Sequence, residues 1–226
     1  MIDAVIFDWG GTLTPWHNVD AEQSWVTGAG NVDLGSRLWA AELAMWKRSQ
    51  SEHRSATMAD VFAEAGHTYD DALLSRYHQW WEPHTLIDPD AIGLFTALRE
   101  RGIKVGVLSN TIWPRTEHER IFARDAITDL IDGAVYTSDI AWTKPHPEAF
   151  AAAMASVGVS DPSRAVFVGD RPWDDIHGAK SVGMRAILIP HSDIPIEQRG
   201  PVEGEADAVV QRLGDVLAHV DAWRAA

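Results

Sequence analysis

Four short segments of the sequence carry polar side chains near the ends of apolar runs, and their residue types are those that phosphoryl-transfer chemistry needs. Asp8 offers a carboxylate that can attack a phosphoryl group. Ser109, Asn110 and Lys144 offer hydroxyl, amide and ammonium groups that can hold phosphoryl oxygens. Asp170 begins a group of carboxylates that can retain Mg²⁺. Together, these residue types predict a site for phosphoryl transfer.

Three carboxylates lie close together in the last of these segments, at Asp170, Asp174 and Asp175. A cluster of like charges is costly unless a cation or a proton relieves it, and Mg²⁺ is the simplest cation for an all-oxygen ligand set. An alternative for one residue of the pair Asp174 and Asp175 is to cap a helix that begins near Ile176.

Short apolar runs alternate with helical patterns along most of the chain. The runs that read as buried strands are residues 2–7, 103–108, 134–136, 165–168, 186–189 and 208–210. The stretches with helical spacing or composition are residues 89–101, 114–124, 146–157, 175–182 and 211–223. This alternation predicts an α/β fold with a doubly wound parallel sheet, in which ligands bind at the carboxyl ends of the strands.

The alternation is broken after the first strand, where several helical patterns follow one another without a convincing strand. Glycines near residues 28–30 and 66–68 separate these patterns. We therefore predict a small α-helical cap at residues 17–85, inserted into a core made of residues 1–16 and 86–226.

Large apolar side chains in the predicted cap recur at helical spacing. Leu38, Leu43 and Trp46 lie on one stripe with Trp39 beside them, and Trp80-Trp81 close a later helix. Because apolar stripes usually bury themselves, we expect these residues to pack between cap and core. The alternative is that a tryptophan faces the substrate.

Composition limits the classes of protein that this chain can represent. A chain of 226 residues is long enough for one core and a smaller lid, and no apolar run reaches the roughly 20 residues that span a bilayer. The net charge of −14 argues against a nucleic-acid surface. Cysteine is absent and the N-terminus shows no signal-peptide pattern, so we expect a cytoplasmic protein without a membrane segment.

The order and spacing of the polar segments resemble the haloacid dehalogenase-like hydrolase superfamily over nearly the whole chain. The resemblance rests on residues 7–12, 108–111, 143–145 and 168–175. The helical insert between the first two segments is similar to the branch with an α-helical cap. The resemblance implies a Rossmann-like core and Mg²⁺-dependent hydrolysis of a small phosphorylated molecule through an aspartyl-phosphate.

The resemblance also implies a role for each matching residue. Asp8 is then the nucleophile, and Lys144 neutralises both the nucleophile and the transferred phosphoryl group. The implied metal ligands are Asp8, the backbone carbonyl of Gly10, Asp170 and Asp175. The implied substrate-binding residues are Gly11, Thr12, Ser109, Asn110 and Lys144, with the first two folding the loop over the phosphate.

One residue departs from the pattern of the family's phosphatases. Where they have Asp-x-Asp-Gly-Thr, this chain has Asp8-Trp9-Gly10-Gly11-Thr12. The second acidic residue of that pattern protonates the leaving oxygen, a role typically worth about 10²–10⁴ in rate. Glycine cannot do this, so the sequence predicts slow or selective turnover unless another group supplies the proton. His17 and His84 are the candidates for that group.

Two alternative functions follow from the same departure. The phosphonoacetaldehyde hydrolase branch has a small residue at the acid position and a cap lysine that forms a Schiff base, and Lys47 is the only lysine in the predicted cap. The second alternative is a non-catalytic, regulatory protein that binds a phosphorylated ligand. The dehalogenase branch does not need magnesium, and the carboxylates at Asp170, Asp174 and Asp175 argue against it.

The predicted cap also contains cations that could meet a second anionic group of the substrate, although such side chains are more often solvated. These residues are Arg37, Lys47, Arg48 and Arg54.

Overall fold

A six-stranded parallel sheet forms the centre of the molecule in the computed structural model, which describes residues 1–190 and 205–225. The strand order is β3-β2-β1-β4-β5-β6, which confirms the predicted α/β fold with a doubly wound parallel sheet. The strands are β1 (Ala4–Phe7), β2 (Lys104–Ser109), β3 (Gly133–Tyr136), β4 (Ala165–Gly169), β5 (Arg185–Leu188) and β6 (Ala208–Val209). Each lies within a few residues of a predicted run.

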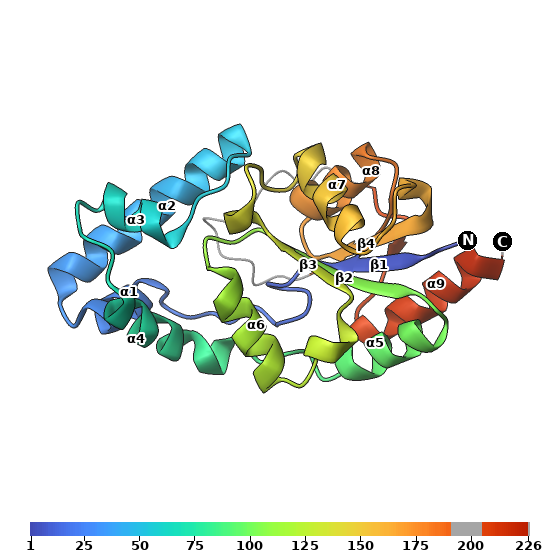
Figure 1. Ribbon diagram of the computed structural model, residues 1–226, viewed down its shortest axis with the longest axis horizontal. Helices are drawn as coiled ribbons and strands as arrows, with labels where there is room; N and C mark the ends of the chain where they lie inside the picture. Colours follow the sequence, from blue (N-terminus) through green and yellow to red (C-terminus); the bar gives the residue numbers. More distant parts are fainter. Residues whose placement is uncertain (191–204, 226) are drawn as a thin grey trace.

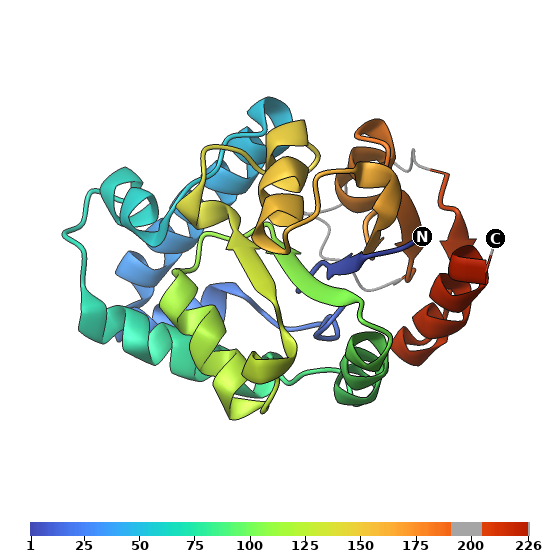
Figure 2. The same ribbon diagram turned by 45° about the vertical axis from the view of Figure 1, so that its right-hand side comes forward.

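Helices cover both faces of this sheet. They are α5 (Ala91–Glu100), α6 (Arg115–Arg124), α7 (Pro147–Ser156), α8 (Gly178–Ser181) and α9 (Val216–Ala225). Figures 1 and 2 show α7 and α8 on one side of the strands and α5 with α9 on the other. The side chains of β1 follow this division, since Val5 and Phe7 pack with α5 and α9 while Ala4 and Ile6 pack with α7 and α8.

Strand order reverses at β1, and this places two of the polar segments side by side. Phe7 pairs with Val168 at the end of the β1–β4 ladder, and the amide of Asp8 donates a hydrogen bond of 2.9 Å to the carbonyl of Val168. The residues that follow these strands, Asp8 and Asp170, therefore leave the sheet at the same edge. This edge is where parallel α/β sheets bind ligands.

Two predicted helices differ from the observed elements. The stretch predicted at 175–182 begins earlier, with a π-helix at Pro172–His177 that leads into α8, because a proline without an amide hydrogen suits the first helical positions. The stretch predicted at 211–223 becomes helical only at Val216, since Leu213–Asp215 form a short 3₁₀ turn.

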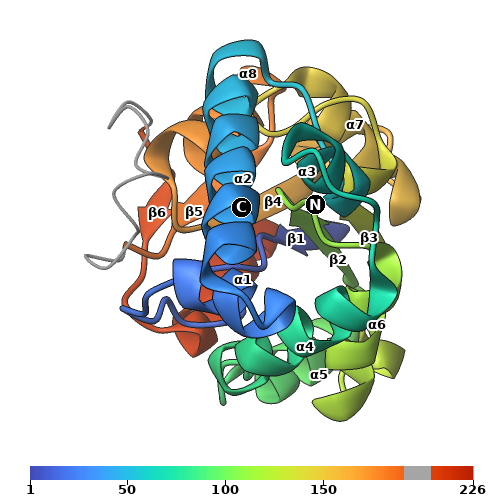
Figure 3. The same ribbon diagram turned by 90° about the vertical axis from the view of Figure 1, so that its left-hand side faces the viewer.

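Four further helices lie beyond the carboxyl ends of the strands: α1 (Glu22–Ala29), α2 (Val32–Glu52), α3 (Met58–Glu64) and α4 (Asp71–Trp81). Figure 3 shows the long helix α2 crossing in front of the sheet. Gly30 ends α1 in the left-handed conformation, with φ of 63°, as the predicted break requires. Side chains cap the starts of three of these helices, at Asn31, Thr57 and Asp70.

Fully buried side chains hold these four helices together. Trp25 of α1 packs against Tyr77 of α4, with ring centroids 4.3 Å apart, and Leu38 of α2 joins the same cluster. The cluster leaves other faces of α2 and α4 directed toward the strand ends. Within the described ranges, no helix has the length and apolar composition that crossing a bilayer would require.

Candidate active site

The loop after β1 places Asp8 at the edge of the sheet and bends sharply behind it. Gly11 has a φ of +88°, a conformation that side chains rarely adopt. A Cβ at this position would lie 2.5 Å from Oδ2 of Asp170 and 2.1 Å from Nε1 of Trp16. The glycine is therefore needed for the close approach of Trp16 and Asp170 to the loop.

Lys144 joins two of the predicted carboxylates in a buried ion network. Its Nζ lies 2.6 Å from Oδ1 of Asp8 and 2.7 Å from Oδ1 of Asp175. Burial alone would lower the pKa of Lys144, but the charges of Asp175 and Asp8 raise it above its ordinary value. The lysine is therefore a fixed positive charge beside Asp8.

Asn110 holds the backbone of Lys144 in place. Its Oδ1 accepts a hydrogen bond of 2.8 Å from the Lys144 amide, and its Nδ2 donates one of 3.0 Å to the Lys144 carbonyl. Sequence reasoning assigned this amide to phosphoryl oxygens; in the structure both of its polar atoms bond Lys144, and the residue also lines the cavity that contains Asp8. Ser109 ends β2, is buried and lines the same cavity as Asp8.

Three carboxylates meet beside this network. Asp8, Asp170 and Asp175 each offer an oxygen, and these atoms lie within 4.8 Å of one another. Asp174 is not part of this cluster; it lines the same cavity and accepts a hydrogen bond of 3.2 Å from Nη1 of Arg171. Neither Asp174 nor Asp175 caps the helical segments that follow, and Asp175 instead accepts a hydrogen bond of 2.9 Å from the Arg171 amide.

The electrostatics of this cluster fit a divalent cation. Burial raises the pKa of Asp170 well above its ordinary range and, against the pull of Lys144, raises that of Asp8 to about 6. Oδ1 of Asp170 is buried and has no hydrogen-bond partner among the described residues. An all-oxygen set with an unsatisfied carboxylate atom is a suitable donor set for Mg²⁺.

Trp16 and Arg171 also border the cluster, and sequence reasoning missed both. The indole Nε1 of Trp16 donates a hydrogen bond of 2.6 Å to Oδ2 of Asp170, and the guanidinium of Arg171 lies 5.5 Å from the Trp16 ring centroid. A Cβ built on Gly10 would have only Cη2 of Trp16 near it, at 3.9 Å. The space for a side chain at the acid position is therefore bordered by an indole. The one available signal was sequence proximity, since Arg171 directly follows Asp170.

The two candidate proton donors lie together. The rings of His17 and His84 have centroids 5.2 Å apart, and both line the cavity that opens at Asp8. Burial, followed by the charge of His17, lowers the pKa of His84. The structure thus brings both histidines to the cavity that contains the nucleophile candidate.

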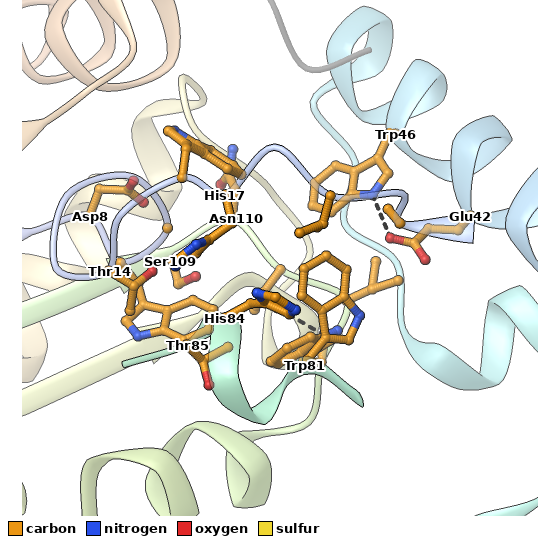
Figure 4. Close-up of a pocket in the computed structure, with 18 of the residues that line it drawn as sticks. Asp8, Thr14, His17, Glu42, Trp46, Trp81, His84, Thr85, Ser109 and Asn110 are labelled. Carbon is orange, nitrogen blue, oxygen red and sulfur yellow. Dashed lines mark hydrogen bonds between the residues drawn. The ribbon is translucent and has the colours of Figure 1, made fainter. Parts of the chain in front are cut away.

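A cavity of about 370 Å³ extends from Asp8 toward α2 and α4. Figure 4 shows Asp8 and Glu42 at opposite sides of the residues that line it, with His84 and Trp81 between them. The expected packing is present, since Leu38 is buried and Trp39, Trp46 and Trp81 pack against the buried core cluster. The same tryptophans also line the cavity, as the alternative that a tryptophan faces the substrate requires. The apolar residues singled out in the sequence of the cap that line the cavity are Trp39, Leu43, Trp46 and Trp81.

Other predicted residues lie outside this cavity. Gly11 and Thr12 line a separate cavity of about 140 Å³ rather than the main one. Lys47 is exposed and does not line the main cavity. The same holds for the cap arginines, since Arg48 pairs with Glu64 and Arg54 lies over the Trp142 ring. The remaining one, Arg37, is exposed.

Glu42 is the acid that sequence reasoning missed. It lies on α2, faces the cavity and is only 8% exposed. Burial raises its pKa, while hydrogen bonds from the side chains of Trp25 and Trp46 lower it. Its helical spacing from Leu38, Trp39 and Trp46 was the available signal.

The residues at the sheet edge, in this order on this fold, are those of a known hydrolase family. The sequence matches the haloacid dehalogenase-like hydrolase family over residues 2–183, and the chain belongs to it. The protein is accordingly a hydrolase of the phosphatase-like kind.

Several known proteins are similar over most of their length. A glyceraldehyde 3-phosphate phosphatase of Methanopyrus kandleri is 27% identical over 199 residues, which cover 84% of each chain. A phosphoglycolate phosphatase of Rhodospirillum rubrum is 31% identical over 206 residues, covering 84% of this chain and 80% of its own. The crystal structure of a phosphatase from Thermococcus onnurineus has the same fold, with a TM-score of 0.71, 23% identity and coverage of 97% and 98%.

Proposed function

We propose that this protein is a Mg²⁺-dependent phosphatase that hydrolyses a small phosphomonoester through an aspartyl-phosphate on Asp8. The observation that carries the proposal is the buried Asp8 carboxylate that lines the cavity, bonded to Lys144 at 2.6 Å and adjacent to Asp170 and Asp175. The phosphatases among its relatives support the same reaction class.

In the first step, a carboxylate oxygen of Asp8 attacks the phosphorus atom. The new bond joins Asp8 to phosphorus, and the bond from phosphorus to the ester oxygen breaks. The Lys144 ammonium and the Ser109 hydroxyl, which line the cavity with Asp8, would stabilise the phosphoryl oxygens, and Asn110 would hold Lys144 in position. The alkoxide that leaves must gain a proton.

In the second step, water attacks the phosphorus of the aspartyl-phosphate, so that inorganic phosphate leaves and Asp8 is regenerated. This water must lose a proton, and Gly10 cannot accept it. His17 and His84 both line the cavity and are the proposed proton carriers. Without a carboxylic acid at position 10, esters with good leaving groups should react faster than alkyl esters.

The proposed magnesium ligands are Asp8, the Gly10 carbonyl, Asp170 and Asp175. When bound there, Mg²⁺ would neutralise the carboxylates and the negative charge of the phosphoryl group. Residues 17–85 are the proposed helical cap over a core of residues 1–16 and 86–226, and the cavity between them is the proposed substrate site.

The two alternatives gain less support from the structure. A Schiff-base mechanism needs an amine inside the cavity, whereas Lys47 is exposed outside it. A protein that only binds a phosphorylated ligand does not require Asp8 held beside Lys144, although that pair could persist without turnover.

The test is phosphate release from a panel of phosphomonoesters, measured with Mg²⁺ and again with a chelator. We expect release that requires Mg²⁺ and is abolished by Asp8→Asn, while Glu52→Gln, an exposed substitution on α2, leaves it intact. Phosphonoacetaldehyde is included to test the Schiff-base alternative. No release from any ester, in protein that still binds phosphate, would refute the proposal in favour of a binding protein.

A further inference from the structure

The cavity beyond Asp8 has two chemically different ends. Its described lining residues include two basic side chains, Lys144 and Arg171. Both belong to the Asp8 end, because Lys144 bonds Asp8 and Arg171 bonds Asp174. The other end is formed by α2 and α4, which contribute one carboxylate, Glu42, and aromatic side chains. Among the described residues, no lysine or arginine lines that end to meet a second anionic group of a substrate.

Neutral donors hold the Glu42 carboxylate. The indole Nε1 of Trp25 donates a hydrogen bond of 2.6 Å to Oε2, and that of Trp46 donates one of 3.1 Å to Oε1. No ion pair with a lysine, arginine or histidine involves Glu42 in the described part of the chain. The Tyr77 side chain is a third hydrogen-bond partner of this carboxyl group. A buried carboxylate is costly without a positive partner, so a bound cation would stabilise its charged form.

Aromatic rings line the part of the cavity that α2 and α4 form. Trp46 bonds Glu42 directly, and the centroid of the Tyr77 ring lies 6.4 Å from that of Trp81, which lies 6.1 Å from that of Trp113. Cations are attracted to the faces of such rings, most strongly when the cation is shielded from water. The aromatic residues that α2 and α4 contribute to the lining are Trp39, Trp46, Tyr77 and Trp81.

We propose that Glu42 and these rings bind an ammonium group, so that the substrate is the phosphomonoester of an amino alcohol. The phosphoryl end of this assignment rests on the proposed function, and the ammonium end rests on the cavity alone. With the phosphate at Asp8, the ammonium group would lie across the cavity at Glu42, which Figure 4 shows on the opposite side. A cavity of about 370 Å³ suits a ligand of this size.

The kinetic test compares phosphocholine with its uncharged analogue, in which a tert-butyl group replaces the trimethylammonium group. The two esters match in shape, but choline is the more acidic alcohol and therefore the better leaving group. Recognition of the positive charge is therefore measured by how the ratio of their kcat/KM values changes on mutation of Glu42. Glu42→Gln should lower the preference for phosphocholine by about tenfold or more, whereas Glu52→Gln on the same helix should preserve it.

A binding measurement separates this inference from the proposed chemistry. Calorimetric titration of the wild-type protein with choline, and with the alcohol that carries a tert-butyl group instead, requires no hydrolysis. Tighter binding of choline by about tenfold would support the ammonium site even if no ester were hydrolysed. Equal binding of the two alcohols, or binding of neither, would overturn it, as would a kcat/KM ratio of the two esters that Glu42→Gln leaves unchanged.

Discussion

Lys144 is the residue on which the charge balance at Asp8 depends. It is almost fully buried, and its ammonium contacts Asp8 and Asp175 at 2.6 and 2.7 Å. The sequence predicted these three residues and their meeting, because each belongs to a segment at the same sheet edge. It did not predict the hydrogen bond from Trp16 to Asp170, or Glu42 between two indoles, because such contacts join residues without a shared motif.

Replacing Lys144 by methionine tests this balance. The variant keeps the length of the side chain but leaves two buried carboxylates without their cation, so we expect the free energy of unfolding to fall by about 3 kcal/mol. We also expect kcat to fall by about 10²–10³. Urea denaturation in the absence of metal measures the change in stability. The rate of phosphate release measures the change in kcat.

The control is Lys180→Met, which removes a partly exposed pair with Asp207. It should change stability by less than about 1 kcal/mol and leave kcat unaltered. Similar losses in both variants would contradict the role assigned to Lys144.

Gly10→Asp tests the missing acid. A Cβ at position 10 meets only Cη2 of Trp16 at 3.9 Å, so the site should accept the new side chain with a small adjustment of the indole. We expect hydrolysis of alkyl phosphates to rise by about tenfold or more relative to p-nitrophenyl phosphate, because only poor leaving groups need a proton donor. Gly10→Ala, which adds no acid, should leave this ratio unchanged, and an equal ratio in both variants would argue against the prediction.

At the scale of elements, the alternation of strands and helices follows from sequence periodicity. Periodicity does not show which side of each helix faces the interior and which faces the cavity. Periodicity places Leu38, Leu43 and Trp46 on one stripe of α2. Only the structure shows that Leu38 fills the interior while Trp46 lines the cavity. The π-helix that begins at Pro172 was not predicted, because the three carboxylates near it were interpreted as metal ligands or as a helix cap.

Helix α6 carries a histidine that should make stability depend on pH. His118 is fully buried among aromatic rings, and burial lowers its pKa to about 3. In the unfolded chain the pKa of this histidine is near 6.5, so the unfolded state binds the proton more readily than the folded state. The free energy of unfolding therefore falls as the pH drops below about 6.5.

From pH 7 to pH 5, this histidine should cost the folded protein about 2 kcal/mol. His118→Phe removes that contribution, so the free energy of unfolding of the variant should fall less over this interval. Urea denaturation of both proteins at the two pH values measures the difference. Identical pH dependence would show that His118 does not carry the effect.

For the whole molecule, a net charge of −14 coexists with the proposed site for a phosphate dianion. The two are compatible because the buried carboxylates lie where a divalent cation would neutralise them. A ligand that binds only the folded state stabilises it, so Mg²⁺ at about 100 times its Kd should add about 2.7 kcal/mol to the free energy of unfolding.

Asp170→Asn should reduce this stabilisation and also raise the stability of the metal-free protein, because it relieves repulsion within the cluster. Asp174→Asn is the matched control, since Asp174 lies outside the cluster and should leave most of the Mg²⁺ effect intact. Thermal unfolding with and without Mg²⁺ measures both variants. Full stabilisation of Asp170→Asn by Mg²⁺ would exclude Asp170 as a ligand.

The central claim is that Asp8 carries the phosphoryl group during turnover. Mass spectrometry of protein quenched with acid during hydrolysis of p-nitrophenyl phosphate in the presence of Mg²⁺ tests it directly. The account predicts one added phosphoryl group, located at Asp8 and absent from Asp8→Asn. Rapid phosphate release with no phosphorylated Asp8, or with the phosphoryl group on another residue, would contradict it.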